Sequence, residues 1–328
     1  MHPKCVIGVD LGGTKLIVGA LDEQLRVLQR VQRPAPGADQ KEVLDTVVDA
    51  VEEVRASSPV EVSAVGFGIP CLIDQDRGVA VMAVNLPLAD IDFRAVMSER
   101  LGLPAFVDND ANVAALAEHR AGAARGCSHA AMLTVGTGIG GGLILSGRLY
   151  RGAHGAAGEL GHMVIDENGP PCQGNCPNHG CLESLASGTA LAREALALAH
   201  ERPDSSLGRA LASGRAITGA LVTELAHDGD SEAIGLIELI GRRLGVGIVN
   251  LVNMLNLEVI VVGGGVIAAG ELLLEPARRV LAERGLRPSR EQVRVERAHF
   301  GTEAGMIGAA ALAFDGLDGL LLGASVEG

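Results

Sequence analysis

One apolar pattern occurs twice in this chain, and the repeat limits its possible folds more than any other feature. Residues 7–21 read IGVDLGGTKLIVGAL, and residues 133–147 read LTVGTGIGGGLILSG. Each segment consists of an apolar strand, a glycine-rich turn and a second apolar strand, which together predict a β-hairpin. Two copies of one hairpin favour a duplicated lobe, and the alternative is that two unrelated hairpins share the same turn chemistry.

The residues around the hairpins predict an alternation of helices and strands. The length of 328 residues is typical of about two domains. In the first half, hydrophobic periodicity predicts strands over 5–10, 15–21, 25–33, 62–68 and 105–107 and helices over 40–55, 92–101 and 111–121. In the second half it predicts helices over 186–200, 217–227, 231–255 and 268–284 and a strand over 259–262. The sequence therefore predicts an α/β protein of two lobes that are joined without a low-complexity linker.

The composition argues against several classes of partner. Aromatic residues make up 2% of the chain, tryptophan is absent and the net charge is −13, so neither base stacking nor phosphate attraction favours nucleic acid. No uninterrupted apolar run reaches the roughly 20 residues of a membrane span. The N-terminus, MHPKCVIGVD, lacks the apolar stretch of a signal peptide. We therefore expect a cytoplasmic protein that binds neither nucleic acid nor membranes.

Three glycine-rich turns follow apolar strands, at residues 10–15 (DLGGTK), 136–141 (GTGIGG) and 263–265 (GGG). Glycine lets backbone amides approach an anion closely, and the hydroxyls of Thr14 and Thr137 add donors. A single turn of this kind is weak evidence, but three turns with Asp10 at the end of the first strand suit a nucleotide and its Mg²⁺ ion. The alternative is a solvated Asp10 at a strand end. No turn matches the Walker pattern, so a different phosphate-binding architecture is expected.

A polar run, DND, separates the strand predicted over 105–107 from the helix that follows it. One of the acids can cap this helix by accepting hydrogen bonds from its free amides, which requires no catalytic role. Only one of the three polar residues is needed as a cap, however, so the others can face a cleft. A kinase that acts on an alcohol needs a carboxylate to receive the hydroxyl proton and an amide to orient the substrate. Asp110 and Asn109 meet that requirement, with Asp110 as the catalytic base.

One histidine and three cysteines lie close together in the sequence: His162, Cys172, Cys176 and Cys181. A Cys₃His set is the composition of a closed structural zinc site, and clustered cysteines in cytoplasmic proteins indicate metal rather than disulfides. His179 is a spare candidate ligand. Two glutamates, Glu159 and Glu183, flank this zinc loop at 162–181. They either accept hydrogen bonds from sugar hydroxyls or support the metal ligands.

With these motifs together, the chain resembles the ROK family of sugar kinases and repressors, and within it the bacterial glucokinases. The resemblance extends from Asp10 to the helix near Gly305, and residues 133–162 are similar to the family signature. It implies an actin-like ATPase fold, made of two ribonuclease H-like α/β lobes around a cleft. The implied small lobe spans residues 1–121, with a C-terminal helix over about 303–316 packed back onto it, and the large lobe spans 122–302.

The resemblance also implies which residues contact the ligands. Sugar contacts are implied for Gly68, Asn85, Asn109, Asp110, Glu159, His162 and Glu183. Contacts to ATP and its Mg²⁺ ion are implied for Asp10, Gly12, Gly13, Thr14, Lys15, Thr137, Gly138, Gly263, Gly264 and Gly265. Two features depart from the family pattern: Cys172 and Cys176 are separated by three residues instead of one, and Cys71 follows Pro70 where a glycine is common.

The activity implied by the resemblance is ATP-dependent phosphorylation of the 6-hydroxyl of a hexose, with glucose as the first candidate, by a homodimer or higher oligomer. A kinase for fructose, mannose, N-acetylglucosamine or N-acetylmannosamine is the nearest alternative. A sugar-sensing repressor of this family would carry a DNA-binding module before the first strand, which here begins by Cys5. A zinc hydrolase would need an open metal position, which a Cys₃His set does not leave.

Overall fold

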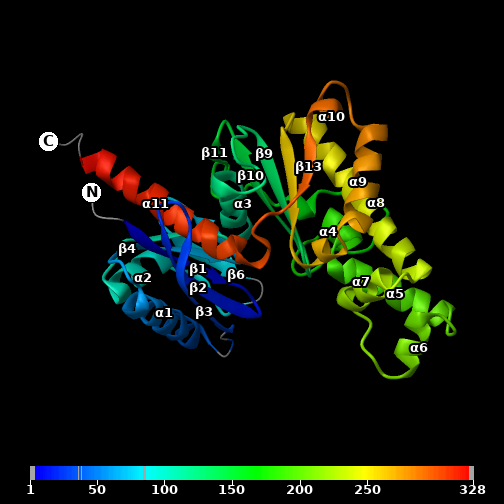
Figure 1. The fold of residues 1–328 in the computed structure, drawn as a ribbon, viewed down its shortest axis with the longest axis horizontal. Coiled ribbons are helices and arrows are strands. Elements are labelled where there is room, and N and C mark those ends of the chain that lie inside the picture. The colour runs from blue at the N-terminus through cyan, green and yellow to red at the C-terminus, as the bar shows by residue number, and fades with distance from the viewer. Residues whose placement is uncertain (1–3, 36, 38, 84–85, 325–328) are drawn as a thin grey trace.

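The first half of the chain forms a five-stranded sheet in the computed structural model, which describes residues 4–35, 37, 39–83 and 86–324 (Figure 1). Its strands are β1 (Cys5–Leu11), β2 (Lys15–Asp22), β3 (Val27–Pro34), β4 (Val62–Ile69) and β8 (Ala105–Asn109), in the order β3-β2-β1-β4-β8. β1, β2 and β3 form an antiparallel meander, whereas β4 and β8 run parallel to β1. β1 and β4 are buried along almost their whole length, so they read as nearly continuous hydrophobic runs.

A second sheet has the same connectivity. Its strands are β9 (Ala130–Val135), β10 (Ile139–Leu145), β11 (Arg148–Leu149), β12 (Val259–Gly263) and β13 (Arg294–Arg297), in the order β11-β10-β9-β12-β13. Again the first three strands form an antiparallel meander, and the last two run parallel to the first. The shared topology confirms the predicted duplication and explains why the two hairpins look alike in sequence.

Helices cover the two sheets. In the first half these are α1 (Gln40–Ser57), α2 (Phe93–Leu101) and α3 (Asp110–Ala121). The second half contains α4 (Leu182–Ala186), α5 (Gly188–Glu201), α6 (Ser206–Ala212), α7 (Gly219–His227), α8 (Ser231–Leu255), α9 (Glu271–Arg284), α10 (Ser289–Gln292) and α11 (Ala304–Ala324). Short 3₁₀ helices lie at Leu160–His162, Gly265–Ala269 and Gly301–Glu303. Within the described residues, none of the helices has the length and hydrophobicity needed to cross a membrane.

Three local features differ from the predictions. The predicted helix over 186–200 corresponds to α5 but begins only at Gly188, because Ser187, with its extended backbone and capping side chain, separates α5 from α4. The predicted helix over 268–284 begins only at Glu271, after Gly270 adopts a φ of +59°. A small antiparallel sheet of β5 (Cys71–Asp74), β6 (Val79–Ala83) and β7 (Ala89–Ile91) was not predicted at all. Its strands have three to five residues, too few for alternation of apolar residues to be a clear signal.

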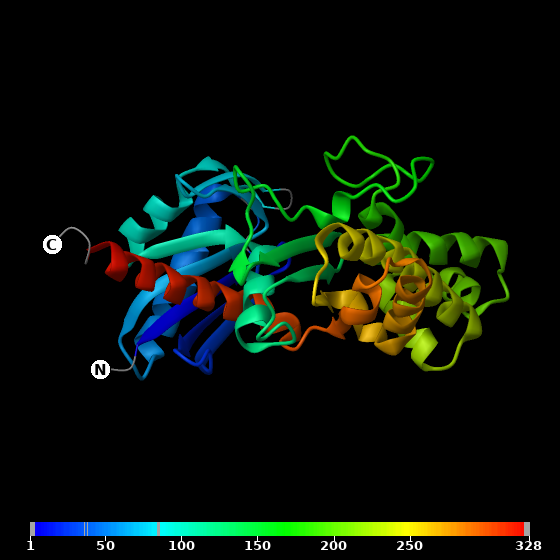
Figure 2. The same ribbon diagram turned by 90° about the horizontal axis from the view of Figure 1, so that it is seen from above.

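Helix α11 packs directly on the backbone of the first sheet, although it follows the whole second half in sequence (Figure 2). Side chains at Gly8 of β1 and Gly66 of β4 would collide with the backbone of α11, at Met306 and Ala309 respectively. On its other side α11 meets α3, where a side chain at Gly308 would collide with the Val113 carbonyl. These contacts belong to a core that includes residues of both sheets, α3 and α11. Helices α3 and α11 thereby join the two halves of the molecule.

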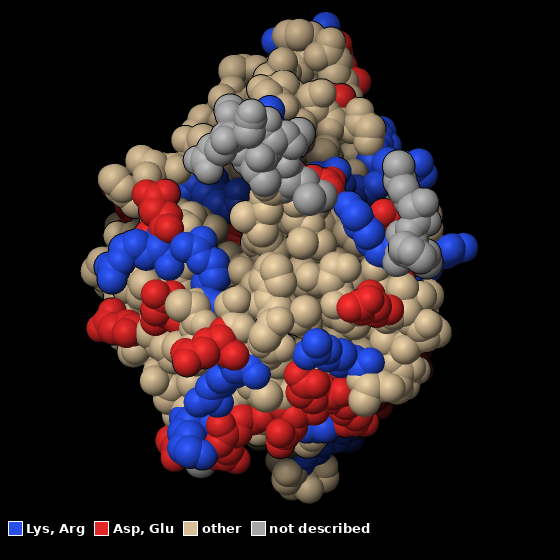
Figure 3. Space-filling model, turned by 90° about the vertical axis from the view of Figure 1, so that its left-hand side faces the viewer, with Lys and Arg blue, Asp and Glu red and all other residues tan. Residues whose placement is uncertain are grey.

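Charged side chains of both signs are interspersed on the outer face of the first half, without a large region of one sign (Figure 3). Ion pairs in this half include Arg100 with Asp45 at 2.7 Å and Arg33 with Glu53. Exposed pairs of this kind contribute at most about 1 kcal/mol each. The close-packed glycine contacts therefore matter more for stability than the charged surface does.

The contact between α11 and α3 can be tested with two matched glycine substitutions in α11. Gly308→Ala should destabilise the protein by at least about 2 kcal/mol, because its methyl group has no room beside the backbone of α3. Gly319→Ala, on the same helix with nothing near the added methyl group, should stabilise it slightly, by about 0.5–1 kcal/mol. Urea denaturation of both variants measures the difference. Equal effects would contradict the close approach of the two helices.

Candidate functional site

The strand β8 runs directly into helix α3, and the polar run lies at this junction. Asn109, and neither of the acids, caps the helix: its Oδ1 atom accepts hydrogen bonds from the amides of Ala111 at 2.9 Å and Asn112 at 3.3 Å. The alternative in which one of the acids caps α3 does not hold, since the Asn109 backbone is extended at the position where the helix begins. Asp110 is the first helical residue, and its carboxylate accepts a hydrogen bond from the adjacent Ala111 amide at 2.8 Å. Capping thus leaves Asp110 available for chemistry.

Asp108, the first acid of the run, is fully buried and holds the junction in place. Its Oδ2 atom lies 2.6 Å from Nε of Arg151, and its Oδ1 atom accepts a hydrogen bond from Nδ2 of Asn112 at 2.9 Å. Arg151 belongs to the segment that leads from β11 to Glu159, so this ion pair ties that segment to the start of α3. Asp108, Asn112 and Arg151 were not predicted as supporting residues. Asp108 carried a signal only as the first acid of the polar run, and Arg151, which is 43 positions away, carried none.

A pocket opens at the start of α3. Its lining includes three predicted sugar contacts, Asn109, Asp110 and Glu159, together with Gly140 and Gly141 of the second hairpin. The remaining predicted sugar contacts have other positions. Gly68 packs against α3, where a side chain would collide with Val113. His162 and Glu183 are not in the pocket lining. Asn85 lies outside the described residues. Carboxylates and an amide that face one pocket suit a ligand with many hydroxyl groups.

Acidic residues gather around this pocket. Burial and the nearby charge of Asp110 raise the pKa of Asp10 to about 7, and Lys15 acts in the opposite direction. Burial also raises the pKa of Asp110; the Ala111 amide opposes this shift and the charge of Glu159 adds to it. Asp10 lies against the first turn of α11, where a side chain at Gly305 would collide with its carboxylate. Mutually repelling carboxylates of this kind fit a divalent cation, which would offset the repulsion.

The predicted nucleotide turns lie at the carboxyl ends of β1, β9 and β12. In the first turn, the Gly12 amide donates to the Lys15 carbonyl at 2.9 Å, and Nζ of Lys15 lies 3.4 Å from the Thr302 carbonyl beside α11. The second and third turns are neighbours, because a side chain at Gly264 would collide with Val135 at the end of β9. Gly264 has a φ of +86°, a conformation that favours glycine. The structure thus places two of the three turns side by side. All of the nucleotide-binding roles remain predictions, for Asp10, Gly12, Gly13, Thr14, Lys15, Thr137, Gly138, Gly263, Gly264 and Gly265.

The predicted zinc ligands converge in space. One ligand atom from each of His162, Cys172, Cys176 and Cys181 lies within 4.8 Å of all the others. Zinc–sulfur bonds of about 2.3 Å place two thiolates of a tetrahedral site about 3.8 Å apart, and the sulfur atoms of Cys176 and Cys181 are 3.9 Å apart. Nδ1 of His162 lies 3.5 Å from the Cys172 sulfur, while its Nε2 faces Glu159 at 3.9 Å. His162 therefore stands between the cysteine cluster and the pocket, and the four residues fit a structural zinc ion.

Glu183 supports the second hairpin. One carboxylate oxygen accepts a hydrogen bond from the Ile139 amide at 2.8 Å, and a side chain at Gly138 would collide with that same oxygen. The other oxygen lies 3.8 Å from the Cys172 sulfur. Glu183 thus connects the cysteine cluster to the turn between β9 and β10, and its predicted contact with a sugar remains a prediction.

Comparison with known proteins decides the family. Residues 6–315 match the model of the ROK family. The chain belongs to the ROK family. The glucokinase of Halalkalibacterium halodurans is 35% identical over 313 residues, which are 94% of each chain. The crystal structure of a ROK family glucokinase from Streptomyces griseus, in complex with glucose and AMPPNP, has a TM-score of 0.84 and 33% identity, covering 95% of this chain and 99% of that one. The xylose repressor of Caldicellulosiruptor bescii is 28% identical, over 94% of this chain and 77% of the repressor.

These findings confirm the predicted ROK membership and the actin-like ATPase fold. Relative to the ROK pattern of cysteines, the wider spacing between Cys172 and Cys176 does not prevent the cluster from forming. The two extra residues are accommodated by a turn in which the Cys176 amide donates to the Gln173 carbonyl at 3.4 Å. His179, the spare candidate, pairs with Pro171 in an isolated bridge and is not in the cluster.

Metal analysis of the purified ROK protein should find about one zinc ion per chain, as a closed Cys₃His site requires. Cys176→Ser should lose the metal and lower the melting temperature, because structural zinc contributes to folding. Cys127→Ser is the matched control, since Cys127 is buried away from the cluster and should leave the zinc content unchanged. A folded, metal-free wild-type protein would show that the cluster is not a zinc site.

Asp10 should make stability depend on pH in the absence of ligands. Its folded pKa of about 7 exceeds the ordinary value of 3.8, so the folded state is penalised as pH rises through this range. Asp10→Asn should therefore be more stable than wild type at pH 8, by about 1–4 kcal/mol, with the difference vanishing near pH 4. Urea denaturation at several pH values measures this. A difference that does not change with pH would contradict the raised pKa.

Proposed function

We propose that this protein is an ATP-dependent glucokinase, which transfers the γ-phosphoryl group of ATP to the 6-hydroxyl of glucose. One observation carries the proposal: the Asp110 carboxylate lies in a pocket with Asn109 and Glu159, next to the glycine-rich hairpin, and a different residue caps its helix. A base, sugar-binding groups and phosphate-binding amides are therefore combined in one place. Glucose is the proposed acceptor because the relatives reported above include two glucokinases, one of them solved with glucose and AMPPNP.

In this proposal, Asp110 accepts the proton of the 6-hydroxyl as the phosphoryl group is transferred. The raised pKa of Asp110 suits this role, because a buried carboxylate is a better proton acceptor than an exposed one. Glu159 and the amide nitrogen of Asn109 orient the sugar, with His162 positioned behind Glu159. Positioning matters more than basicity, since phosphoryl transfer passes through a loose transition state.

The ATP phosphates are proposed to bind the amides of the glycine-rich turns. Mg²⁺ that arrives with ATP would neutralise the negative charge of the phosphates, and Asp10 would hold its hydration shell. Bound zinc would keep His162 and the loop over 162–181 in shape. Closing the two lobes over both ligands would exclude water that otherwise competes as an acceptor.

The division into lobes is part of the same proposal. Residues 1–121 with the C-terminal helix over about 303–316 would form the small lobe, and residues 122–302 the large lobe, with the pocket at their junction. We further propose that the protein acts in the cytoplasm and as a homodimer or higher oligomer.

A substrate panel with ATP tests the proposed activity. Glucose, mannose, fructose, N-acetylglucosamine and N-acetylmannosamine are compared by kcat/KM in a coupled assay. Glucose should give the highest value. A clear preference for another sugar would change the substrate but keep the kinase, whereas no ADP formation with any sugar would reject the kinase.

The role of Asp110 is tested by Asp110→Asn. The variant should fold normally, because Asn109 holds the helix cap, but kcat should fall by at least about 100-fold, since it lacks a proton acceptor. Calorimetry should still detect the binding of glucose and of ATP. A variant that retains more than about a tenth of the wild-type kcat would show that Asp110 is not the base.

A further inference from the structure

Residues of α4 and α5 make hydrogen bonds to the turn between β9 and β10. The Gly188 amide at the start of α5 donates to the Gly136 carbonyl at 2.7 Å, and the Thr189 hydroxyl donates to the Thr137 carbonyl at 2.8 Å. From α4, Glu183 accepts from the Ile139 amide. Each contact engages the backbone of the turn itself. Its conformation therefore depends on where these two helices sit.

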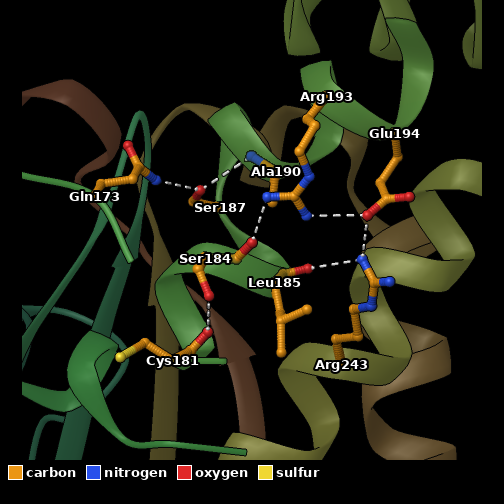
Figure 4. A network of polar contacts seen from close by, with 9 residues as sticks. All are labelled: Gln173, Cys181, Ser184, Leu185, Ser187, Ala190, Arg193, Glu194 and Arg243. Carbon is orange, nitrogen blue, oxygen red and sulfur yellow. Dashed lines mark hydrogen bonds and ion pairs between the residues drawn. The ribbon is translucent and has the colours of Figure 1, made fainter. Parts of the chain in front are cut away.

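Gln173 belongs to the loop over 162–181 that carries the cysteines, called here the cysteine loop, and its side chain points toward the start of α5 (Figure 4). Its Nε2 atom donates to the Ser187 hydroxyl at 3.1 Å and lies 3.5 Å from the Thr137 carbonyl, at the outer limit of a hydrogen bond. Ser187 is completely buried and caps α5 by accepting from the Ala190 amide at 3.2 Å. Gln173 thus contacts both the turn and the cap of the helix that holds the turn.

The two helices are themselves fixed to one another and to α8. Arg193 of α5 donates to the carbonyl of Ser184 at 2.8 Å, and the Ser184 hydroxyl donates to the Cys181 carbonyl at 2.9 Å (Figure 4). Glu194 pairs with Arg193 at 3.0 Å and with Arg243 of α8 at 2.9 Å. Hydrogen bonds and ion pairs therefore connect α4, α5 and α8 into one block of helices. Gln173 approaches this block from the cysteine loop, next to Cys172.

We propose that Gln173 is a positioning residue for the nucleotide: it connects the cysteine loop to the turn at residues 136–139 and keeps the amides of Thr137 and Gly138 directed at the phosphates of ATP. The other two amides of the turn are used within the protein, by Gly136 to the Gly138 carbonyl and by Ile139 to Glu183. The inference rests on the proposed function, which assigns this turn to ATP. It adds a role for the cysteine loop, which serves the nucleotide through Gln173 as well as the sugar through His162. Gln173 lies in the part of the loop that is longer than in the ROK pattern.

The test compares Gln173→Met with wild type. Methionine keeps the length of the side chain but removes the amide donor. Calorimetry with a non-hydrolysable ATP analogue and Mg²⁺ should show an affinity about 3- to 10-fold weaker, as expected for the loss of one hydrogen bond. The KM for ATP should rise by a similar factor, while the affinity for glucose and the zinc content stay unchanged. Asn175→Ala, an exposed residue of the same loop, is the control and should change none of these quantities.

The outcomes separate this inference from the proposed function. Wild-type protein that binds no ATP analogue would reject the nucleotide site itself. Wild-type protein that binds it, with Gln173→Met unchanged, would overturn only the role of Gln173. Loss of zinc or an equal loss of glucose affinity would also overturn it, because Gln173 would then merely support the loop. If Gln173→Met does not fold, Thr189→Val removes the other side-chain donor to the Thr137 carbonyl and should weaken nucleotide binding selectively.

Discussion

The direct packing of α11 on the bare backbone of β1 and β4 is the constraint on which the rest of the structure depends. Because Gly8 and Gly66 have no side chains, the helix lies close enough for its first turn to abut the Asp10 carboxylate at Gly305. The opposite side of α11 presses on α3 at Gly308. The helix that bears Asp110 is therefore wedged between α11 and the second sheet. The parallel pairing of Asp10 with Gly68 and of Gly68 with Asp108 already places Asp10 and the start of α3 at one edge of the sheet, and α11 packs against both.

This arrangement concentrates negative charge in the pocket. The charge of Asp110 raises the pKa of Asp10, and the charge of Glu159 raises the pKa of Asp110, so either protonation or a bound cation relieves the repulsion. This repulsion destabilises the folded protein at the position where a cationic ligand would relieve it. Nearby, buried Asp108 pairs with half-buried Arg151 and ties the segment after β11 to the start of α3. Breaking one partner of such a pair leaves an uncompensated buried charge, so it fixes the loop more firmly than an exposed pair would.

The sequence was informative wherever a signal was local. The duplicated hairpins, the long helices and the clustering of the four predicted zinc ligands all follow from spacing and periodicity, and the structure agrees with them. The cap of α3 could not be assigned from the sequence because three adjacent polar residues can each fill that role, and only the backbone conformation of Asn109 decides between them. The pairing of Arg151 with Asp108 was not predictable, because nothing near Arg151 in the sequence indicates its partner. Gln173 was missed for the same reason, since its partners Ser187 and Thr137 are distant from it in sequence.

The connectivity of α11 also has a consequence for the order in which the chain folds. β1 and β4 are synthesised early, but the helix that covers their glycine-lined face begins only at residue 304, after the whole second sheet. Until then the apolar surface around Gly8 and Gly66 has no native cover, so the first sheet cannot complete its core during most of translation. The second sheet is also completed late, by β13 at Arg294–Arg297. We therefore expect this face of the first sheet to reach its native packing only after the second sheet has been synthesised, and a nascent chain to acquire its Asp10 environment only when the final helix docks.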